Sequence, residues 1–354
     1  HSEVTLPLNG WLDQMLTLGA EWVDQRMDDP FSNTQTTTEA GEGPGLSGTD
    51  RDTKTDAQIA SLFVESNIEL RPGTTLTPGL RFDHHSLTGS NWSPSLNLSQ
   101  ALNDEFTLKA GIARAYKAPN LYQSNASYAL YSNGLGCWDF VTGGPGCFLV
   151  GNENLEAETS VNKELGIEFE SADYHASLTW FRNDYRDKVE AGRTPVGSVN
   201  FTQGSSTRVA NVFQWTNIPR AVVEGFEGNL KMPLASSLSW NTNFTWMLRS
   251  ENRETGEPLS IIPEYTINST LDWQVTQPLS TQATVTWYGK QSPGKLDYQG
   301  NVLTGDARRD RDVGGGGHAV GTVAEETLVQ VQLEDLVLAQ LGLDLPRQQD
   351  LGQL

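Results

Sequence analysis

The chain has 354 residues, which is enough for one large or two ordinary domains. Its formal net charge of -20 argues against a nucleic-acid-binding protein, because phosphate contacts need clustered Lys and Arg. Hydrophobic residues make up only 37% of the chain, yet it has 34 Gly and 10 Trp, a mixture that favours a β-barrel with a polar interior over a soluble enzyme. No run of about 18 apolar residues is present, which excludes a transmembrane helix but not barrel strands, whose apolar residues alternate with polar ones.

The first third of the chain alternates between apolar and polar residues, which is the pattern of β-strands. In the segment 60–70, for example, Leu62 and Val64 share one face, and Glu65 and Glu69 share the other. The sequence RPGT at 71–74 predicts a tight turn. The predicted strands lie within 3–8, 14–24, 60–70, 75–85, 94–99 and 106–113, and the polar segment 28–56 is a long loop.

The same alternation returns after residue 155 and is clearest near residue 240. In the segment 237–248, Trp240, Phe244 and Trp246 share one face, and Asn241 and Asn243 share the other. The predicted strands lie within 160–170, 174–180, 237–248, 264–275 and 281–290, and a second long loop covers about 191–214.

The connections favour a membrane barrel over a soluble sandwich. Short turns such as 71–74 and 277–280 alternate with long loops, as in up-and-down outer-membrane barrels. Tryptophans near strand ends fit the aromatic girdles at the membrane interfaces, the alternative being ordinary core packing: Trp22, Trp92, Trp180 and Trp287. We therefore predict an all-β fold, an antiparallel up-and-down transmembrane β-barrel of about twelve strands with long extracellular loops.

The composition changes abruptly near the C-terminus. After Tyr298 the chain has no Phe, Tyr or Trp, and a polar low-complexity stretch is followed by a Leu-rich one without barrel alternation. We predict a barrel over residues 1–298 and an aberrant tail over residues 299–354, with a helix from Val323 to Leu341. Such a change indicates a shifted reading frame or a fused foreign segment; the alternative is a genuine divergent tail.

The segment 114–155 joins two predicted strands and holds the only two cysteines, Cys137 and Cys147. Long connections are usually functional or disordered, and the aromatic residues of this one argue against disorder. No further Cys or His lies nearby to complete a zinc site. We predict an external binding loop that a Cys137–Cys147 disulfide closes in an oxidising compartment. The alternative is two unpaired buried thiols.

Other polar residues are weaker candidates for a site. His84 and His85 are adjacent in a strand and face opposite sides, so they cannot share a metal ion, and a solvated or girdle role is favoured. The cluster at the end of segment 174–187 is more consistent with ion pairs of the barrel wall than with catalysis: Arg182, Asp184, Arg186 and Asp187. Neither a GxSxG nor an HExxH pattern occurs, so we predict no enzyme activity and no metal site.

Five longer strings resemble one family. Residues 76–100, 111–123, 178–192, 221–230 and 259–273 are similar to TonB-dependent outer-membrane receptors for ferric enterobactin and related catecholate siderophores, and the resemblance runs from about residue 3 to residue 297. It implies a 22-stranded barrel in the outer membrane, filled by an N-terminal plug and energised by the TonB complex. The two cysteines fall where these receptors carry a small disulfide in an external loop.

The resemblance also implies a ligand. A ferric catecholate is anionic and carries flat rings, so a receptor needs cations and aromatic faces. The loop and its root supply both, and the predicted ligand-binding residues are Arg114, Tyr116, Lys117, Tyr122, Tyr128, Tyr131 and Trp138. Iron enters only as part of the siderophore, and no cofactor is predicted. For Arg114 the alternative is pairing with carboxylates of neighbouring strands.

The chain departs from the family pattern at both ends. It shows no plug and no TonB box before His1, and it lacks several N-terminal strands and the final strands with their terminal aromatic residue. We expect the middle and later part of a barrel, which would not transport alone. The partners implied for the intact receptor are the siderophore, the TonB complex and outer-membrane lipid. The alternative functions are a passive outer-membrane porin and, less favoured, a barrel hydrolase.

Overall fold

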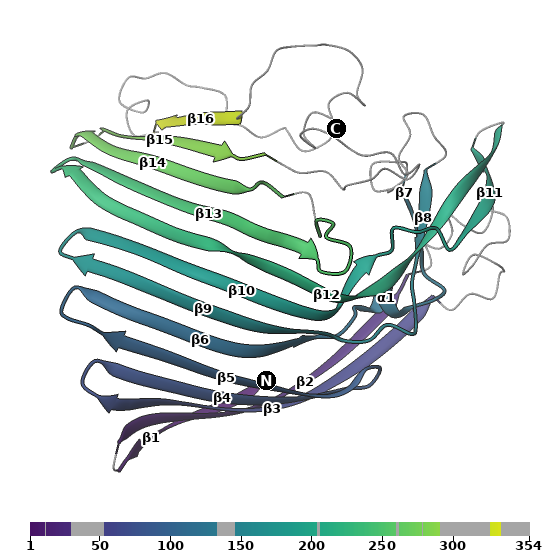
Figure 1. The fold of residues 1–354 in the computed structure, drawn as a ribbon, viewed down its shortest axis with the longest axis horizontal. Helices are drawn as coiled ribbons and strands as arrows, with labels where there is room; N and C mark the ends of the chain where they lie inside the picture. The colour runs from purple at the N-terminus through teal and green to yellow at the C-terminus, as the bar shows by residue number, and fades with distance from the viewer. Residues whose placement is uncertain are drawn as a thin grey trace.

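The computed structural model describes eight stretches of the chain: residues 1–10, 12–29, 53–132, 146–203, 206–259, 262–277, 279–290 and 326–333. Apart from one short helix, the regular elements are β-strands (Figure 1). The helix is α1 (Leu121–Ser124), and the strands are β1 (Ser2–Asn9), β2 (Asp13–Asp28), β3 (Lys54–Arg71), β4 (Thr74–His85), β5 (Gly89–Ala101), β6 (Phe106–Lys117), β7 (Ala129–Ser132), β8 (Cys147–Val150), β9 (Glu158–Ser171), β10 (Tyr174–Ala191), β11 (Gly197–Gln203), β12 (Ser206–Ala235), β13 (Leu238–Asn252), β14 (Tyr265–Thr276), β15 (Leu279–Tyr288) and β16 (Glu326–Leu333).

The large sheet follows the order of the chain. Its strands run β1-β2-β3-β4-β5-β6-β9-β10-β12-β13-β14-β15-β16, and each pairs antiparallel with the next. This path of thirteen strands confirms the predicted up-and-down fold and comes close to the predicted count of about twelve. Within the described residues the sheet is open, because β1 and β16 each have a neighbour on one side only.

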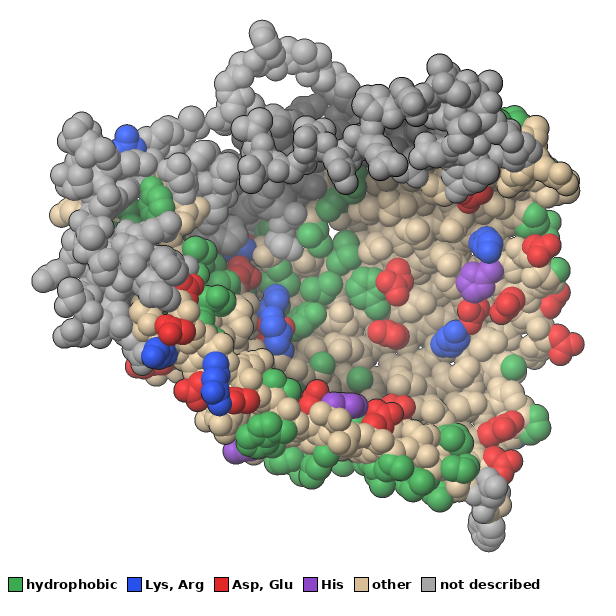
Figure 2. All heavy atoms as spheres, turned by 180° about the vertical axis from the view of Figure 1, so that it is seen from behind, with side chains coloured by type: hydrophobic (Ala, Val, Ile, Leu, Met, Phe, Trp, Pro, Cys, Tyr) green, Lys and Arg blue, Asp and Glu red, His purple; other side chains and the backbone are tan. Residues whose placement is uncertain are grey.

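The two faces of the sheet have opposite chemistry. One face exposes large apolar side chains, such as Leu62 (62% exposed), Trp22 (61%) and Trp92 (55%). The other face of β3 to β5 buries polar groups, including Ser61 and Asp83, and Figure 2 shows a hollowed face with scattered acidic and basic side chains. A soluble sandwich would bury its apolar face, so this inversion fits a barrel wall that faces lipid.

The turns reflect the local sequence. At 71–74, Pro72 precedes Gly73, whose φ of 78° is a left-handed conformation that glycine adopts without steric cost, and the predicted tight turn is confirmed. One predicted regularity is wrong, because short turns do not alternate strictly with long loops. The turn between β4 and β5, at the long-loop end of the sheet, has only three residues, 86–88.

Two loop predictions are also wrong in part. The segment 191–214 forms an antiparallel hairpin of β11 with the first residues of β12, and the cysteine loop contains α1, β7 and β8. Strand β8 pairs antiparallel with β7 and parallel with β12. We call β7, β8, β11 and residues 206–214 of β12 the loop sheet; it lies at the end of the large sheet away from most short turns (Figure 1).

The predicted helix at 323–341 is wrong over residues 326–333. These residues form β16, which pairs antiparallel with β15 from Thr281↔Leu333 to Tyr288↔Glu326. The sequence ETLVQVQL alternates in the segment that pairs, and the free edge of β15 offers hydrogen-bonding groups that favour a strand over a helix. The remainder of the predicted tail, and the long loop at 30–52, lie outside the described residues.

Candidate functional site

Three of the predicted site residues lie at the end of β6, the root of the cysteine loop. The pairing of β5 with β6 ends at Ser95↔Ala113, and beyond it the Arg114 guanidinium donates to Asn91 Oδ1 and to the Trp92 carbonyl oxygen. Both acceptors are neutral groups of β5. Arg114 therefore joins the two strands where backbone pairing stops, and these contacts are not the pairing with carboxylates that was its alternative role.

The other two root residues differ in exposure. The Tyr116 hydroxyl lies 2.7 Å from Thr88 Oγ1, which links the root to the turn after β4. Lys117 is the last residue of β6, is exposed, and stands opposite Glu158 in the register with β9. Lys117 is thus the cation of this group that remains available to a ligand.

The short helix α1 comes directly after the root and is fixed at both ends. Asn120 and Gln123 form a capping box, in which the Gln123 N–H donates to Asn120 Oδ1 (2.8 Å) and the Asn120 N–H donates to Gln123 Oε1 (3.0 Å). Buried Asn125 donates to Thr55 Oγ1 of β3 at 2.7 Å. A side chain on Gly151 would meet the Asn125 carbonyl oxygen at 1.8 Å, so glycine permits this close packing. The helix therefore holds its residues against the barrel wall.

The tyrosines of the loop divide into exposed and buried ones. Tyr122 on α1 is 43% exposed, and its ring packs on that of Tyr128, with 4.7 Å between centroids. Tyr128 is 8% exposed, and the Tyr131 ring lies 5.1 Å from that of Phe148. Burial raises the pKa of the Tyr131 phenol, although nearby Arg208 opposes this shift. Tyr128 and Tyr131 serve packing, whereas Tyr122 presents a ring to the outside.

A small hydrophobic core lies within the loop sheet. It joins both long loops, because its members come from β7, β8, β11 and β12: Ala129, Phe148, Val150, Val199, Ala210 and Val212. Phe148 is 1% exposed, and Tyr131 packs against the cluster. The cysteine loop is therefore a packed platform joined to the 197–214 hairpin, and sequence periodicity alone did not reveal this.

Of the two cysteines of the predicted disulfide, only Cys147 lies within the described residues. Cys147 is disulfide-bonded, and the described part of the chain contains no free cysteine. Cys137 and Trp138 lie outside the described residues, so the pairing of Cys147 with Cys137 and the role of Trp138 stay predictions.

A cavity of about 530 Å³ opens beside the root. Arg81 lies in its wall and donates to Glu21, Asp83 and Ser61, each at 2.8 Å. His85 is 1% exposed and accepts the Leu87 N–H at Nδ1 (3.2 Å), so the solvated or girdle role expected for it is wrong, whereas His84 is exposed. The alternation with Arg81 and Asp83 on β4 was the signal for its position. The complete lining is Gln25, Ile59, Arg81, Asp83, His85, Ser93, Ala115, Tyr116, Ala118, Pro119 and Asn120.

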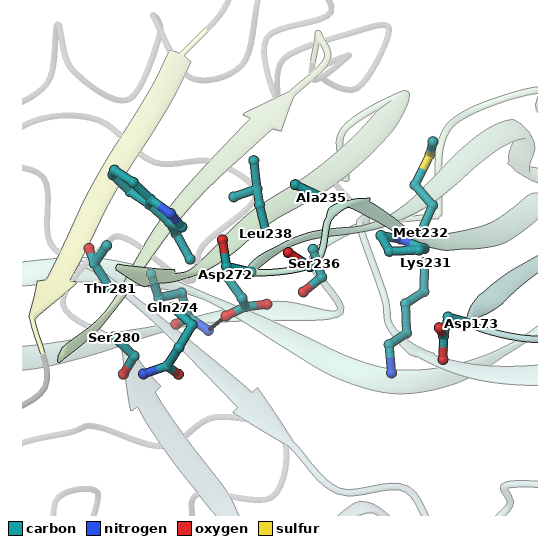
Figure 3. A pocket seen from close by; sticks show the side chains of 15 residues that line it. Asp173, Lys231, Met232, Ala235, Ser236, Leu238, Asp272, Gln274, Ser280 and Thr281 are labelled. Atoms are coloured by element: carbon teal, nitrogen blue, oxygen red, sulfur yellow. Dashed lines mark hydrogen bonds between the residues drawn. The ribbon is translucent and has the colours of Figure 1, made fainter. Parts of the chain in front are cut away.

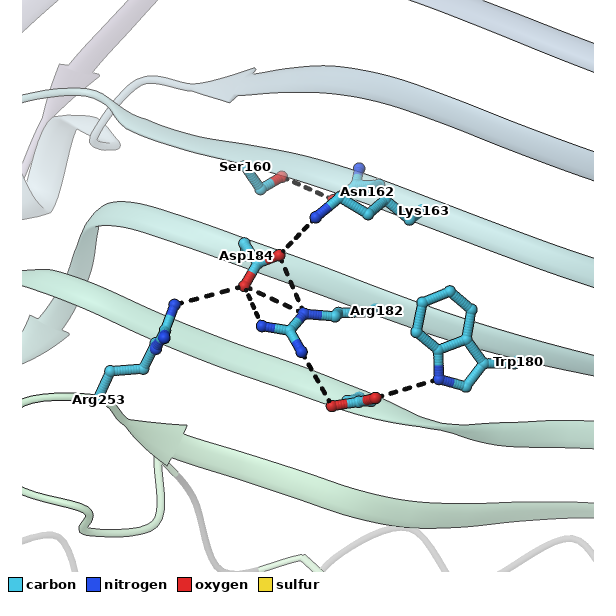
Figure 4. Close-up of polar contacts among 8 residues, drawn as sticks. Ser160, Asn162, Lys163, Trp180, Arg182, Asp184 and Arg253 are labelled. Carbon is cyan, nitrogen blue, oxygen red and sulfur yellow. Dashed lines mark hydrogen bonds and ion pairs between the residues drawn. The ribbon is translucent and has the colours of Figure 1, made fainter.

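The charged cluster of β10 forms the ion pairs predicted for the barrel wall (Figure 4). Asp184 accepts from Arg182 at 2.9 Å and from Lys163 at 2.8 Å, and Arg182 also lies 3.4 Å from Glu224. The Trp180 indole donates to Glu224 at 3.1 Å. In the described part of the chain neither Arg186 nor Asp187 takes part in an ion pair, so the prediction holds for Arg182 and Asp184 but not for the other two.

A second cavity, of about 450 Å³, lies at the short-turn end of the sheet (Figure 3). Its lining comes from the ends of β12, β13, β14 and β15, from the turn that joins β12 to β13 and from Asp173 before β10; it includes Lys231, Ser236 and Asp272. None of the predicted site residues lines it. The described residues contain no group of three His, Cys, Asp or Glu side chains placed to hold a metal ion. Among the same residues no helix has the length and apolarity to cross a membrane.

Comparison with known proteins identifies the family. Residues 2–316 match the model of the TonB dependent receptor-like β-barrel. The chain is 58% identical over 307 residues to the ferric enterobactin receptor of Pseudomonas aeruginosa and 53% identical over 313 residues to the ferrienterobactin receptor of Escherichia coli. These alignments cover 87% and 88% of this chain but 41% of each relative, so the chain spans about two fifths of their length.

Solved structures agree with the sequence comparison. A crystal structure of a mutant ferric enterobactin receptor from Pseudomonas aeruginosa in complex with enterobactin superimposes with a TM-score of 0.74 at 54% identity, covering 93% of this chain and 45% of that one. The siderophore receptor PirA from Acinetobacter baumannii gives a TM-score of 0.66 at 39% identity and covers 94% of this chain and 46% of its own. The exposed apolar face, the up-and-down sheet and these relatives place the chain in the outer membrane, and the chain belongs to the TonB-dependent receptor-like β-barrel family.

Proposed function

We propose that the chain is part of a receptor that captures ferric enterobactin, or a related catecholate siderophore, on its external loops and imports it with energy from the TonB complex. The two relatives and the PirA structure compared above are named as ferric enterobactin or siderophore receptors and not as porins or enzymes. Because the chain spans about two fifths of the first two, the activity is proposed for the intact receptor.

The observation that carries the proposal is the pair of exposed groups on a fixed platform. Lys117 ends β6, and Tyr122 lies on α1, a few residues after the strand. The capping box and the Asn125 contact to β3 hold this segment, so binding a ligand costs little ordering entropy. A cation beside an aromatic face suits a catecholate ligand, since the cation offsets the oxygen charge and the ring stacks on the catechol.

The remaining predicted residues take supporting roles in this proposal. Arg114 and Tyr116 hold the root through Asn91, Trp92 and Thr88. Tyr128 and Tyr131 are packing residues, and for Trp138 and the Cys137–Cys147 disulfide the roles predicted from the sequence are kept. No cofactor is required, because iron arrives already chelated by the siderophore.

The first prediction concerns these two exposed groups in the intact receptor. Replacing Lys117 and Tyr122 together by Ala removes a charge-assisted contact and a ring contact, each worth about 1 to 2 kcal/mol, so we expect the affinity for ferric enterobactin to fall roughly 30-fold or more. Quenching of tryptophan fluorescence during a titration measures this affinity. Leu130→Ala, which removes another exposed side chain of the same loop, is the matched control and should change little. Unchanged affinity in the double variant would contradict the proposed site.

A further inference from the structure

The connection from β13 to β14 folds back onto the wall of the barrel. Strand β13 pairs with β12 as far as Asn252, whereas its pairing with β14 stops before that. The chain then turns at Gly256, whose φ of 67° is a left-handed conformation that favours glycine and whose N–H donates to the Asn252 carbonyl oxygen at 2.7 Å. Pro258 forms an antiparallel bridge with Glu251. We call residues 253–259 the strap; it lies at the long-loop end of the sheet (Figure 1).

The part of the wall next to the strap can be assigned to the inward face, which is the face opposite the apolar one. Cross-strand pairing places Trp180 of β10 and Trp246 of β13 in one row, and Trp246 is 54% exposed on the apolar face. Successive side chains of a strand point to opposite faces, and the register of β10 with β12 is continuous from Trp180 to Tyr185. Tyr185 and its cross-strand neighbour Ala221 therefore face inward.

Leu259, the last residue of the strap, packs on this inward wall. It forms a small hydrophobic cluster with Ala221 and Ile218, and Tyr185 packs against the cluster. Leu259 is 9% exposed and Ala221 is 0% exposed. The interior of an outer-membrane barrel is mostly polar, so an apolar cluster on the inward face needs a cover. Leu259 of the strap contributes to that cover.

Arg193 joins the strap to the neighbouring loop. It lies in the connection after β10, and its guanidinium donates to Glu257 Oε2 (2.8 Å) and to the Pro258 carbonyl oxygen (2.6 Å), both in the strap. The same guanidinium donates to Glu190 Oε1 at 3.2 Å. The Glu190 side chain is only 13% exposed. Arg193 therefore bridges the end of β10 and the strap, and we call these contacts the latch.

The latch is incompletely satisfied. Arg193 lies between two carboxylates, those of Glu190 and Glu257. Among the described residues Glu190 Oε2 has no hydrogen-bond partner, although it is buried. A buried polar cluster that leaves a group unpaired stabilises the folded state less than a fully paired one. Such a contact suits a segment that opens locally while the surrounding sheet stays folded.

We propose that the strap is a lid over the inward wall at the mouth of the barrel, that Arg193 is its latch, and that release of the latch admits bulky solutes from outside to the wall of β10 and β12. Opening requires the loss of the latch, of the Pro258 bridge and of the Leu259 contacts, whereas the ladder between β12 and β13 can stay intact. The guanidinium fork suits this task, because it reaches a carboxylate and a carbonyl oxygen together, as the compact ammonium of Lys does less well. This inference goes beyond siderophore binding and does not depend on it.

The test uses the intact receptor in detergent with a cysteine reporter at Ala221, the wall residue beneath Leu259. Ala221→Cys is a small change at a position that is 0% exposed, so its reaction with a maleimide attached to polyethylene glycol reports opening of the strap. In the Arg193→Gln background we expect labelling to be roughly tenfold faster or more, because charge-assisted contacts to the strap are lost. Arg193→Lys should give an intermediate rate.

Two controls separate the latch from general loosening. Glu254→Cys, at an exposed position of the strap, should label quickly and equally in every background. Arg26→Gln removes an exposed cation at the long-loop end of β2 that pairs with Asp24, and it should leave labelling of the Ala221→Cys reporter unchanged.

Three results would overturn the proposal: an unchanged rate in Arg193→Gln, an equal acceleration by Arg26→Gln, or a reporter that labels as fast as Glu254→Cys while Arg193 is present. Heat-modifiable gel mobility checks that each variant folds. If Arg193→Gln does not fold, Glu257→Gln replaces it, since it removes the charge on the strap's side of the latch. The same acceleration is then expected, and an unchanged rate would again contradict the proposal.

Discussion

Phe148 is the side chain on which the packing of the loop sheet depends most. It is 1% exposed and lies in the cluster that joins β7, β8, β11 and β12. Phe148→Ala should destabilise the loop sheet by about 3 to 5 kcal/mol, because it removes apolar contacts and leaves a cavity. We expect faster proteolysis of the cysteine loop and weaker siderophore binding, with the barrel intact. The control Leu130→Ala, at an exposed position of β7, should leave both unchanged; equal protection of Phe148→Ala would show that the cluster does not hold the loop.

The sequence nominates residue types for the candidate site but does not separate their roles. All seven predicted residues carry a charge or a ring, but only tertiary packing separates Lys117 and Tyr122, which are exposed, from Tyr128, which is buried. The role of Arg114 could not be predicted from the sequence either, because its hydrogen bonds depend on where the pairing of β5 with β6 stops. His85 differs from His84 only in the face it occupies, and alternation with Arg81 and Asp83 was sufficient to predict that.

At the scale of the elements, period-two alternation located the strands of the large sheet, since half-buried strands carry the strongest local signal. Where the predicted secondary structure is wrong, contacts with other strands determine the conformation of the segment. The 197–214 hairpin carries Gly, Ser, Thr and Gln rather than clean alternation, and it is held by the cluster it shares with β8. β16 has a short alternating run, but its Leu-rich surroundings do not alternate, and its strand conformation depends on pairing with the edge of β15. The domain boundary predicted at residue 298 stays a prediction.

Strand β3 allows a direct test of which face meets lipid. Val64 is 37% exposed on the apolar face, and Glu65 lies on the opposite one. Val64 falls near the middle of the roughly ten residues that cross a membrane from the 71–74 turn, so Val64→Arg in the intact receptor should cost about 2 to 4 kcal/mol. Urea unfolding in lipid vesicles measures this free energy. Glu65→Arg is the matched control and should cost much less; a reversed order would mean that the faces are assigned the wrong way round.

Cys147, the first residue of β8, forms a disulfide. If Cys147 pairs with Cys137, the closed loop of about ten residues should stabilise the folded loop by about 3 kcal/mol. Cys147→Ser in the intact receptor should therefore speed cleavage of the loop by added protease without changing the barrel. Mass spectrometry before and after reduction identifies the bonded pair. Finding Cys137 as a free thiol in the oxidised protein would disprove the predicted pairing.

In the molecule as a whole, the open sheet separates an apolar outward face from the loop sheet, and the net charge is strongly negative. The outward face is apolar up to the row of Trp180 and Trp246, and the loop sheet and α1 lie beyond it at the long-loop end. The net charge of -20 opposes long-range attraction of an anionic siderophore, so the capture that we propose depends on local groups such as Lys117. The rigid platform that holds Lys117 and Tyr122 meets that requirement.

Uptake of iron by cells tests the central claim most directly. A receptor-deleted bacterial strain that expresses the intact receptor is given radiolabelled ferric enterobactin, with and without functional TonB. We predict saturable uptake that disappears when TonB is removed and that the Lys117 and Tyr122 double Ala variant weakens. Uptake that rises linearly with concentration and persists without TonB would contradict the account and indicate passive diffusion through a pore.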